Sequence, residues 1–365
     1  MRQVFRIIFS PVILVLIATA MQGQSLSTMA FTEKADVLGG APSLAFGGGA
    51  GILYIAYRPN DTSNSLYVNS TSDGVNLSGA VHFPGIVMDS DPSIALDISN
   101  DLLQVAFLTA NQPVDYVTIC SISLPLSTAS TTTCTPFQTI TSRNAPSILN
   151  QGAECNFGNN YGTLVVAYNY QSPNLIVPPT LGLFTAVNSP YNGHQLTDSV
   201  STSVNLWSSP TVAGCFLNGS GNTAYTITVA GQSVTKTGLS QYSAGPLLTE
   251  AFNSGLQSQP VVKTTNSSSL PPYISYFHDA SNGAPIVAFT SGSNNQLAFE
   301  IGLQGTMSSS PEIVNNGTQT GGRPAIAYWS LFSGYSAVSV AFKANDGSNR
   351  LMLGTITAAS FTTVD

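Results

Sequence analysis

The sequence predicts an all-β fold, a β-propeller of six four-stranded blades, on three observations. A proline followed by a small or β-branched residue and then an aliphatic one recurs six times, glycine turn signals separate short apolar runs, and no segment beyond residue 24 has helical period. Successive prolines lie 50, 54, 64, 50 and 64 residues apart, close to the length of a propeller blade. The six triplets are Pro42-Ser43-Leu44, Pro92-Ser93-Ile94, Pro146-Ser147-Ile148, Pro210-Thr211-Val212, Pro260-Val261-Val262 and Pro324-Ala325-Ile326.

Each unit is expected to start its innermost strand at the proline and to continue into a second strand. Ala56-Tyr57 and Ala106-Phe107 both stand fourteen and fifteen residues after their prolines. The run Ile52–Tyr57 is almost wholly apolar, as expected of a strand packed between two neighbouring blades. Comparable second strands are predicted at Val166-Ala167-Tyr168, Thr223-Ala224-Tyr225, Ile274-Ser275-Tyr276 and Val340-Ala341-Phe342.

The two ends of the chain predict how the ring closes. After Pro324 there is room for strands near Ala325–Tyr328, Ala337–Lys343 and Arg350–Thr357, and then the chain nearly ends. Residues 28–38 form a strand-like segment that has no blade of its own. We expect this segment to supply the outer strand of the sixth blade, which would protect both edges. A seventh blade is the alternative.

Residues 1–24 resemble an export signal, with Arg2 and Arg6 before an apolar run and Ala18-Thr19-Ala20 as a small-residue cleavage site. No later stretch approaches the roughly 18 apolar residues that a membrane span needs. We therefore expect residues 25–365 to form a single propeller domain that is secreted, extracellular or periplasmic, with no membrane span.

Composition argues against nucleic acid as a partner. Without the two signal arginines the chain has eight basic and seventeen acidic residues, a balance of 8 − 17 = −9, which is unsuited to holding phosphate backbones. Charged residues make up 7% of the chain, where about 25% is usual. Surfaces filled instead by Ser, Thr, Asn and Gly are typical of extracellular all-β proteins.

Four cysteines, Cys120, Cys134, Cys155 and Cys215, allow three complete pairings, and the exported context favours oxidation. We expect Cys120 to pair with Cys134 as a staple between neighbouring strands of one blade. Cys155 and Cys215 follow Pro146 and Pro210, on adjacent inner strands, and are expected to form the second bridge.

No cofactor or metal is expected. His82, His194 and His278 stand far apart, without ligand-like spacing. The glycine run at Gly47 lacks the downstream Lys-Ser/Thr of a phosphate loop and is expected to be a tight strand connection.

The first unit carries a family resemblance. Residues 41–80, with Ala41-Pro42-Ser43-Leu44-Ala45, Leu53–Arg58, Asn64–Val68 and Ser70–Leu77, resemble the blades of sialidase-like propellers and of the bacterial fucose-binding lectins. The resemblance implies that the Asp73-Gly74 segment is a degenerate aspartate box, a structural turn whose aspartate caps backbone amides. Leu77 replaces the aromatic residue that ends this motif, so no catalytic residue is carried over.

The resemblance also implies what a sialidase-like glycoside hydrolase would need: three arginines for a substrate carboxylate, a Tyr–Glu pair and an acidic acid/base residue. The mature chain has only four arginines: Arg58, Arg143, Arg323 and Arg350. This enzyme is therefore kept as an alternative, and no catalytic residue is assigned.

A lectin-like or adhesive module that binds glycans or glycoconjugates is the preferred prediction. Sugar recognition uses neutral donors and acceptors beside an aromatic face. The loop that follows the first unit's second strand offers both, and it matches the corresponding loop of the resembled lectins. The predicted site residues are Tyr57, Arg58, Asp61 and Asn64, with Arg323 added because it precedes the sixth inner strand near the centre. A plain solvent-exposed loop, and a protein-interaction scaffold without a small-molecule site, remain alternatives. The sequence predicts no oligomeric state.

Overall fold

The computed structural model describes residues 31–357 apart from 48–50, 110–114, 152–162, 171–177, 190–192, 220–221, 239–240, 258–261, 264–265, 279–282, 293, 304–305, 308–311, 314–317 and 331–335. All regular elements in this part are strands. They are β1 (Thr32–Val37), β2 (Ser43–Gly47), β3 (Ile52–Tyr57), β4 (Ser65–Thr71), β5 (Val81–Val87), β6 (Ser93–Asp97), β7 (Leu102–Thr109), β8 (Tyr116–Ser123), β9 (Thr132–Thr141), β10 (Ser147–Asn150), β11 (Thr163–Tyr170), β12 (Thr180–Ser189), β13 (Gly193–Asn205), β14 (Thr211–Gly219), β15 (Asn222–Lys236), β16 (Tyr242–Asn253), β17 (Val262–Lys263), β18 (Tyr273–His278), β19 (Gly283–Ser291), β20 (Gln296–Leu303), β21 (Thr306–Met307), β22 (Glu312–Ile313), β23 (Ala325–Ser330), β24 (Ser336–Lys343) and β25 (Arg350–Thr357).

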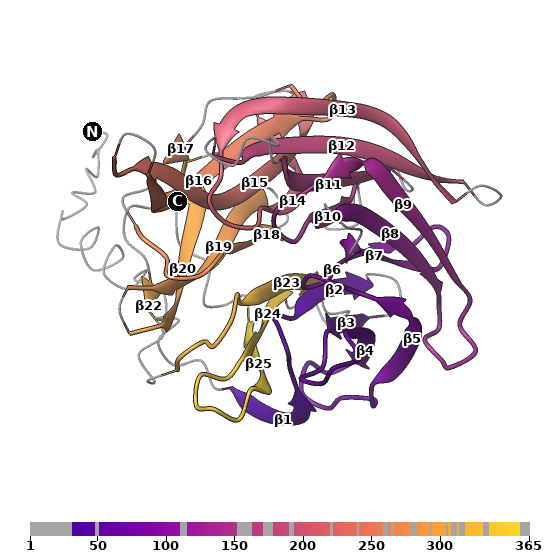
Figure 1. Cartoon of the computed structure of the whole chain (residues 1–365). Coiled ribbons are helices and arrows are strands. Elements are labelled where there is room, and N and C mark those ends of the chain that lie inside the picture. The colour runs from indigo at the N-terminus through magenta and orange to yellow at the C-terminus, as the bar shows by residue number, and fades with distance from the viewer. Residues whose placement is uncertain are drawn as a thin grey trace, which may run out of the picture.

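The strands form six antiparallel sheets arranged as the blades of a propeller (Figure 1). Blades 1 to 4 are β2–β5, β6–β9, β10–β13 and β14–β17. Blade 5 is β18, β19 and β20 with two short strands, β21 and β22, on its outer side. The innermost strands contact one another in the cyclic order β2, β6, β10, β14, β18, β23 and back to β2. The prediction of an all-β, six-bladed propeller is confirmed.

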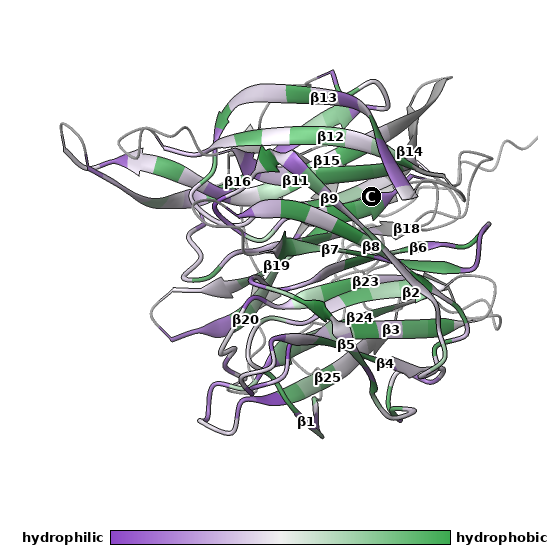
Figure 2. Ribbon diagram, turned by 45° about the vertical axis from the view of Figure 1, so that its right-hand side comes forward, coloured by the Kyte–Doolittle hydropathy of each residue, from purple (hydrophilic) through white to green (hydrophobic). Residues whose placement is uncertain are grey.

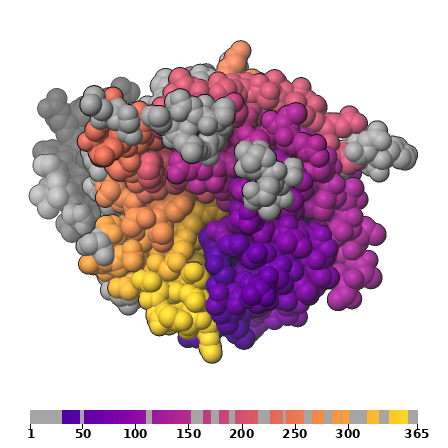
Figure 3. Space-filling model, viewed as in Figure 1, coloured from indigo at the N-terminus to yellow at the C-terminus, as the bar shows by residue number. Residues whose placement is uncertain are grey.

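Blade 6 is closed by the N-terminal strand, as predicted. β1 pairs antiparallel with β25, the third strand from the centre of this sheet, with Thr32 opposite Leu353. Arg350 Nη1 lies 2.7 Å from Glu33 Oε1 across the same pair. Leu38, directly after β1, is fully buried. Figure 3 shows the result: the yellow C-terminal segment lies directly against the indigo N-terminal one.

One of the six predicted inner strands was wrong. The segment after Pro260 is β17, the outermost strand of blade 4, whereas the inner strand of blade 5 is β18, directly after Pro272. Ile274-Ser275-Tyr276, predicted as a second strand, therefore lies in an inner strand. The corrected spacings for this unit, 272 − 210 = 62 and 324 − 272 = 52 residues, are more even than the predicted 50 and 64. Tyr273 replaces the small residue that follows the other prolines, which hid this repeat.

The serine of the repeated triplet joins neighbouring blades. The hydroxyl of Ser43 accepts a hydrogen bond from the backbone N–H of Ile94 at 3.1 Å. Ser93 accepts from Ile148, and Ser147 from Val212, at the same distance. Each serine thus satisfies a buried amide of the next blade's inner strand, which explains why a small hydroxyl residue recurs at this position.

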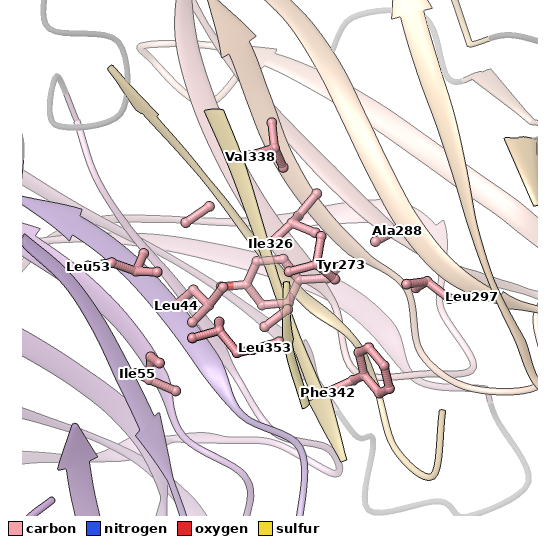
Figure 4. Packing of buried hydrophobic residues seen from close by; sticks show 14 of the residues in the cluster. Leu44, Leu53, Ile55, Tyr273, Ala288, Leu297, Ile326, Val338, Phe342 and Leu353 are labelled. Atoms are coloured by element: carbon pink, nitrogen blue, oxygen red, sulfur yellow. The ribbon is translucent and has the colours of Figure 1, made fainter. Parts of the chain in front are cut away.

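The second strands are apolar on both faces because alternate residues pack against different blades. Leu53 and Ile55 of β3 belong to a cluster with blades 5 and 6, whereas Tyr54 and Ala56 face blade 2. Figure 4 shows the first of these clusters, in which Leu53 and Ile55 lie beside Tyr273 and the blade 6 strands. Figure 2 shows the same apolar character along β2, β3 and β24. The core is therefore a set of layers between the blades.

A disulfide joins Cys120 and Cys134, which lie opposite each other on β8 and β9 of blade 2. This prediction is confirmed. Cys155 and residues 1–24 lie outside the described residues, so the second bridge and the export signal stay predictions. Within the described part, the structure contains no helix long and apolar enough to cross a membrane.

Candidate functional site

The predicted sugar loop lies on the end of the ring where the inner strands begin, which we call the proline face because Pro42, Pro92, Pro146, Pro210, Pro272 and Pro324 lie there. Arg58 follows β3 and reaches across to blade 2. Its Nη2 lies 3.7 Å from Asp91 Oδ1, and its Nη1 donates to Asn64 Oδ1 at 3.4 Å. The two charged side chains are 23% and 28% exposed. Arg58, Asn64 and Asp91 therefore form a partly exposed polar cluster between blades 1 and 2.

The backbone holds this cluster in place. Asn64 has a φ of 51°, a left-handed conformation that asparagine tolerates well, and its carbonyl accepts from Met88 N at 2.9 Å. The carbonyl of Arg58 accepts from Gly39 N at 2.8 Å. The loop between β3 and β4 is thus fixed both to the connection before blade 2 and to the connection before blade 1.

Gly40 makes room for the Asp91 carboxylate. A Cβ atom at Gly40 would lie 1.8 Å from Asp91 Oδ1, which no side chain permits. The carboxylate therefore packs directly on the backbone of the connection before blade 1, and any larger residue at position 40 would displace it.

Asp61 lies at the exposed tip of the same loop. Its Oδ1 accepts from the Ser63 hydroxyl at 2.6 Å and from Ser63 N at 2.8 Å. These two hydrogen bonds to the ionised form hold the pKa of Asp61 below its ordinary value. The tip consequently presents a fixed carboxylate to solvent.

Tyr57 points away from this cluster. Its ring is 2% exposed, and its hydroxyl donates to Asp36 Oδ1 of β1, in the junction between blades 6 and 1. Burial and the Asp36 carboxylate raise the pKa of Tyr57. Its ring stacks on Tyr67 at 5.9 Å, and Tyr67 stacks on the exposed His82 at 4.4 Å.

Arg323 also lies apart from the cluster. It directly precedes β23, is 5% exposed, and places its guanidinium carbon 5.5 Å from the centre of the Tyr273 ring. Arg143, on the connection before blade 3, is exposed and lies 5.9 Å from the Trp207 ring. The five predicted site residues are therefore distributed: Arg58, Asn64 and Asp61 share one loop, while Tyr57 and Arg323 are buried elsewhere.

The charged pair of Arg58 and Asp91 is not repeated around the ring. Ser43, the first residue of the inner strand β2, pairs with Ala56 of β3. Arg58 stands two residues after Ala56. Applied to the other blades, the same register places Leu108, Asn169, Gln232, Thr290 and Lys343 at the corresponding positions. The residues directly before the six prolines are Ala41, Asp91, Ala145, Ser209, Pro271 and Arg323. One blade junction thus combines an arginine with a carboxylate.

Sequence reasoning missed Asp91 and Gly40. A signal for Asp91 was present, because it is the one carboxylate that directly precedes a repeated proline. Its contact with Arg58 depends on the packing of blade 2 against blade 1, which a loop taken by itself does not reveal. Gly40 had no signal beyond its place before Pro42.

The cluster has the chemistry of a polar ligand site rather than of a metal centre. A guanidinium, a carboxylate and an amide offer donors and acceptors side by side. Among the described residues, no three His, Cys, Asp or Glu side chains gather as metal ligands. A small cavity is lined by residues of several inner strands, among them Leu44, Ile94 and Asn150, and none of the predicted site residues lines it.

Comparisons with known proteins support the fold. No protein-family model and no curated protein matches the chain. Among solved structures, AofleA from Arthrobotrys oligospora superposes with a TM-score of 0.62 at 11% identity, over 90% of this chain and 85% of that one. A mutant of AofleA with three arginines replaced by alanine gives the same TM-score at 12% identity, over 90% and 86%. The sialidase of Trypanosoma rangeli in complex with sialic acid gives 0.51 at 9% identity, over 92% of this chain and 58% of that one.

These likenesses concern the fold: the described part of the chain is a six-bladed β-propeller, similar in fold to AofleA and to the Trypanosoma rangeli sialidase. Propellers of this fold host many activities, which depend on the residues of the site.

Proposed function

We propose that this protein is a secreted, non-catalytic carbohydrate-binding propeller that binds a glycan at the junction of blades 1 and 2. The observation that carries the proposal is the partly exposed cluster in which Arg58 lies between Asn64 and Asp91. Vicinal sugar hydroxyls each donate and accept, so a guanidinium beside a carboxylate can satisfy two of them together.

Four of the five predicted residues have a place in this proposal, and Asp91 joins them. Arg58 and Asp91 bind the sugar hydroxyls, Asn64 orients Arg58, and Asp61 contacts the ligand from the rim of the loop. Tyr57 supports the loop from below through its bond to Asp36. The tight backbone contacts of Arg58 and Asn64 favour binding because a fixed loop loses little entropy when a ligand arrives.

The arrangement of the arginines supports a non-catalytic role over the glycosidase alternative. Arg58 contacts Asp91, Arg350 contacts Glu33, and Arg143 lies over Trp207. Arg323 lies over Tyr273, so the four arginines of the described part contact different side chains, whereas a sialidase-like site requires three that converge on one carboxylate.

The structural comparison supports a sugar ligand by analogy. A sialidase solved with sialic acid has a related fold, and the sequence of residues 41–80 resembles lectin blades. The same fold hosts many unrelated functions, and a protein-interaction scaffold is the alternative to be tested.

Binding of the mature protein to a glycan array, followed by titration calorimetry of the best ligand, tests the proposal. We expect Arg58→Ala and Asp91→Asn each to weaken binding by about tenfold or more, as expected for the loss of a charge-assisted hydrogen bond. Arg350→Ala, which removes an exposed arginine from an ion pair on blade 6, is the matched control and should bind normally.

The outcomes separate the three candidates. No glycan bound by the folded protein would favour the scaffold. Binding that survives both Arg58→Ala and Asp91→Asn would refute this site. Turnover of fluorogenic glycosides that is lost in Arg323→Ala would favour the glycosidase.

A further inference from the structure

Arg323 presents a buried charge without a polar partner. Its side chain lies at the junction of blades 5 and 6 on the proline face and is 5% exposed. Its Nε, Nη1 and Nη2 atoms are all buried and have no hydrogen-bond acceptor in the structure. The described contact of the guanidinium is with the Tyr273 ring, 5.5 Å from its centre. A buried guanidinium is strongly unfavourable unless an opposite charge and acceptors meet it.

The junction of blades 1 and 2 shows the kind of partner that Arg323 lacks. Arg323 directly precedes Pro324, just as Asp91 directly precedes Pro92. Asp91 meets Arg58, whereas the position corresponding to Arg58 in blade 5 is Thr290, which is fully buried and bonded to the Thr320 hydroxyl at 2.7 Å. At the junction of blades 5 and 6 the cation of Arg323 thus stands where the acid Asp91 stands between blades 1 and 2, and no carboxylate of the described residues forms an ion pair with it.

A second cation lies close by. A Cβ atom at Gly322 would be 3.8 Å from Lys343 Cβ and 3.9 Å from Lys343 Cε, so the lysine side chain runs along the backbone beside Arg323. The two ion pairs of the described residues, Arg58 with Asp91 and Arg350 with Glu33, include neither Arg323 nor Lys343.

We propose that Arg323 holds a small monovalent anion, such as a halide or formate, between blades 5 and 6. The burial of Arg323 limits the size of the ligand. Because all three guanidinium nitrogens are closed off from the surface, a group as large as a sugar does not reach them. The guanidinium determines the chemical class of the ligand, since it offers a fixed fork of N–H donors and a positive charge that a single small anion neutralises. This ion stabilises the ring and lies at a different junction from the proposed glycan site.

Thermal unfolding in chloride tests the proposal. Chloride is exchanged for gluconate, an anion too large for the site, at constant ionic strength. We expect the Tm of the wild-type protein to rise by about 2 °C for each tenfold increase in chloride above the dissociation constant. Arg323→Met should abolish this dependence. Arg143→Met, which removes an exposed arginine, should keep it and is the matched control.

Crystals soaked in bromide give a direct readout on the unaltered protein. The anomalous signal should place a bromide within about 3.5 Å of the Arg323 nitrogens. The proposal is overturned if no such peak appears, or if Tm depends on chloride equally in wild type and Arg323→Met. If Arg323→Met does not fold, the bromide experiment on wild type decides alone. Loss of glycan binding in Arg58→Ala would leave this result unaffected, so the two proposals fail separately.

Discussion

Single hydroxyl groups specify how the blades meet. Ser43, Ser93 and Ser147 occupy the same place in three consecutive triplets, are buried, and accept from the next blade's inner strand. The polar residue in an otherwise apolar motif is therefore structural. Tyr273 is a further single residue that joins blades: its hydroxyl lies 3.2 Å from the Ser43 hydroxyl and so connects blade 5 with blade 1.

Replacing Ser93 by alanine tests this role. The backbone N–H of Ile148 would lose its acceptor while it stays buried, which typically costs about 1–3 kcal/mol. We expect the free energy of unfolding, measured by urea denaturation, to fall by that amount. Ser72→Ala, at an exposed turn position, should change it by less than about 0.5 kcal/mol. Equal effects of the two substitutions would contradict the assignment.

Outer strands also connect neighbouring blades. β13 of blade 3 inserts His194 into blade 2, where Nε2 lies 2.8 Å from Gln104 Oε1 and 3.2 Å from the Ser121 hydroxyl. The backbone N–H of His194 donates to Thr135 Oγ1 at 3.0 Å. Nδ1 is buried and has no partner. This contact between blades 2 and 3 therefore requires a neutral imidazole at His194.

Acid should weaken the contact that His194 makes between blades 2 and 3. Burial lowers the pKa of His194 from 6.5 to about 4, although the Asp97 charge acts in the opposite direction. Between these values the unfolded chain binds a proton that the folded one does not, so stability falls as pH falls from 6.5 towards 4. The difference amounts to about 3 kcal/mol.

Urea unfolding at pH 7 and pH 4 measures this loss. His194→Gln should remove most of the pH dependence over this range, because its amide does not titrate. His82→Gln, at an exposed position, should keep the wild-type dependence. If His194→Gln loses as much stability as wild type on acidification, other groups carry the effect.

The whole ring depends on the strand that closes it. β1 pairs with β25 and also contacts blade 1, where Asp36 accepts from Tyr57 and Lys34 donates to the Val75 carbonyl. It thus joins the last blade to the first by both backbone and side-chain contacts. Without it, β25 would present an open edge, which favours association with other chains.

Deleting residues 25–37 tests the closure. We expect the truncated protein to lose roughly 3 kcal/mol or more of its free energy of unfolding, since the backbone pairing of β1, its part-buried hydrogen bonds and the packing of Phe31 on Phe342 disappear together. Size-exclusion chromatography should also show oligomers. Glu33→Ala, which removes only an exposed ion pair, should cost less than about 1 kcal/mol. A truncated protein as stable and monomeric as wild type would refute the role of β1.

The sequence by itself determined the all-β class, the six repeats, the closing N-terminal strand and the bridge between Cys120 and Cys134. It could do so because blade length, turn residues and two-sided burial are local signals that repeat along the chain. The wrong prediction of the inner strand of blade 5 also has a local cause: Tyr273 interrupts the triplet pattern, and the segment after Pro260 matches it.

Only the tertiary structure decided which polar residues meet. Arg58 and Asn64 were predicted from their loop, but Asp91 joins them from the next blade, and Tyr57 turns to Asp36 in the opposite junction. Arg323 was placed near the centre by sequence, and its burial without an acceptor is visible only when the blades are packed. Contacts between blades link residues dozens to hundreds of positions apart, so their distances are set by the closure of the ring rather than by any local pattern.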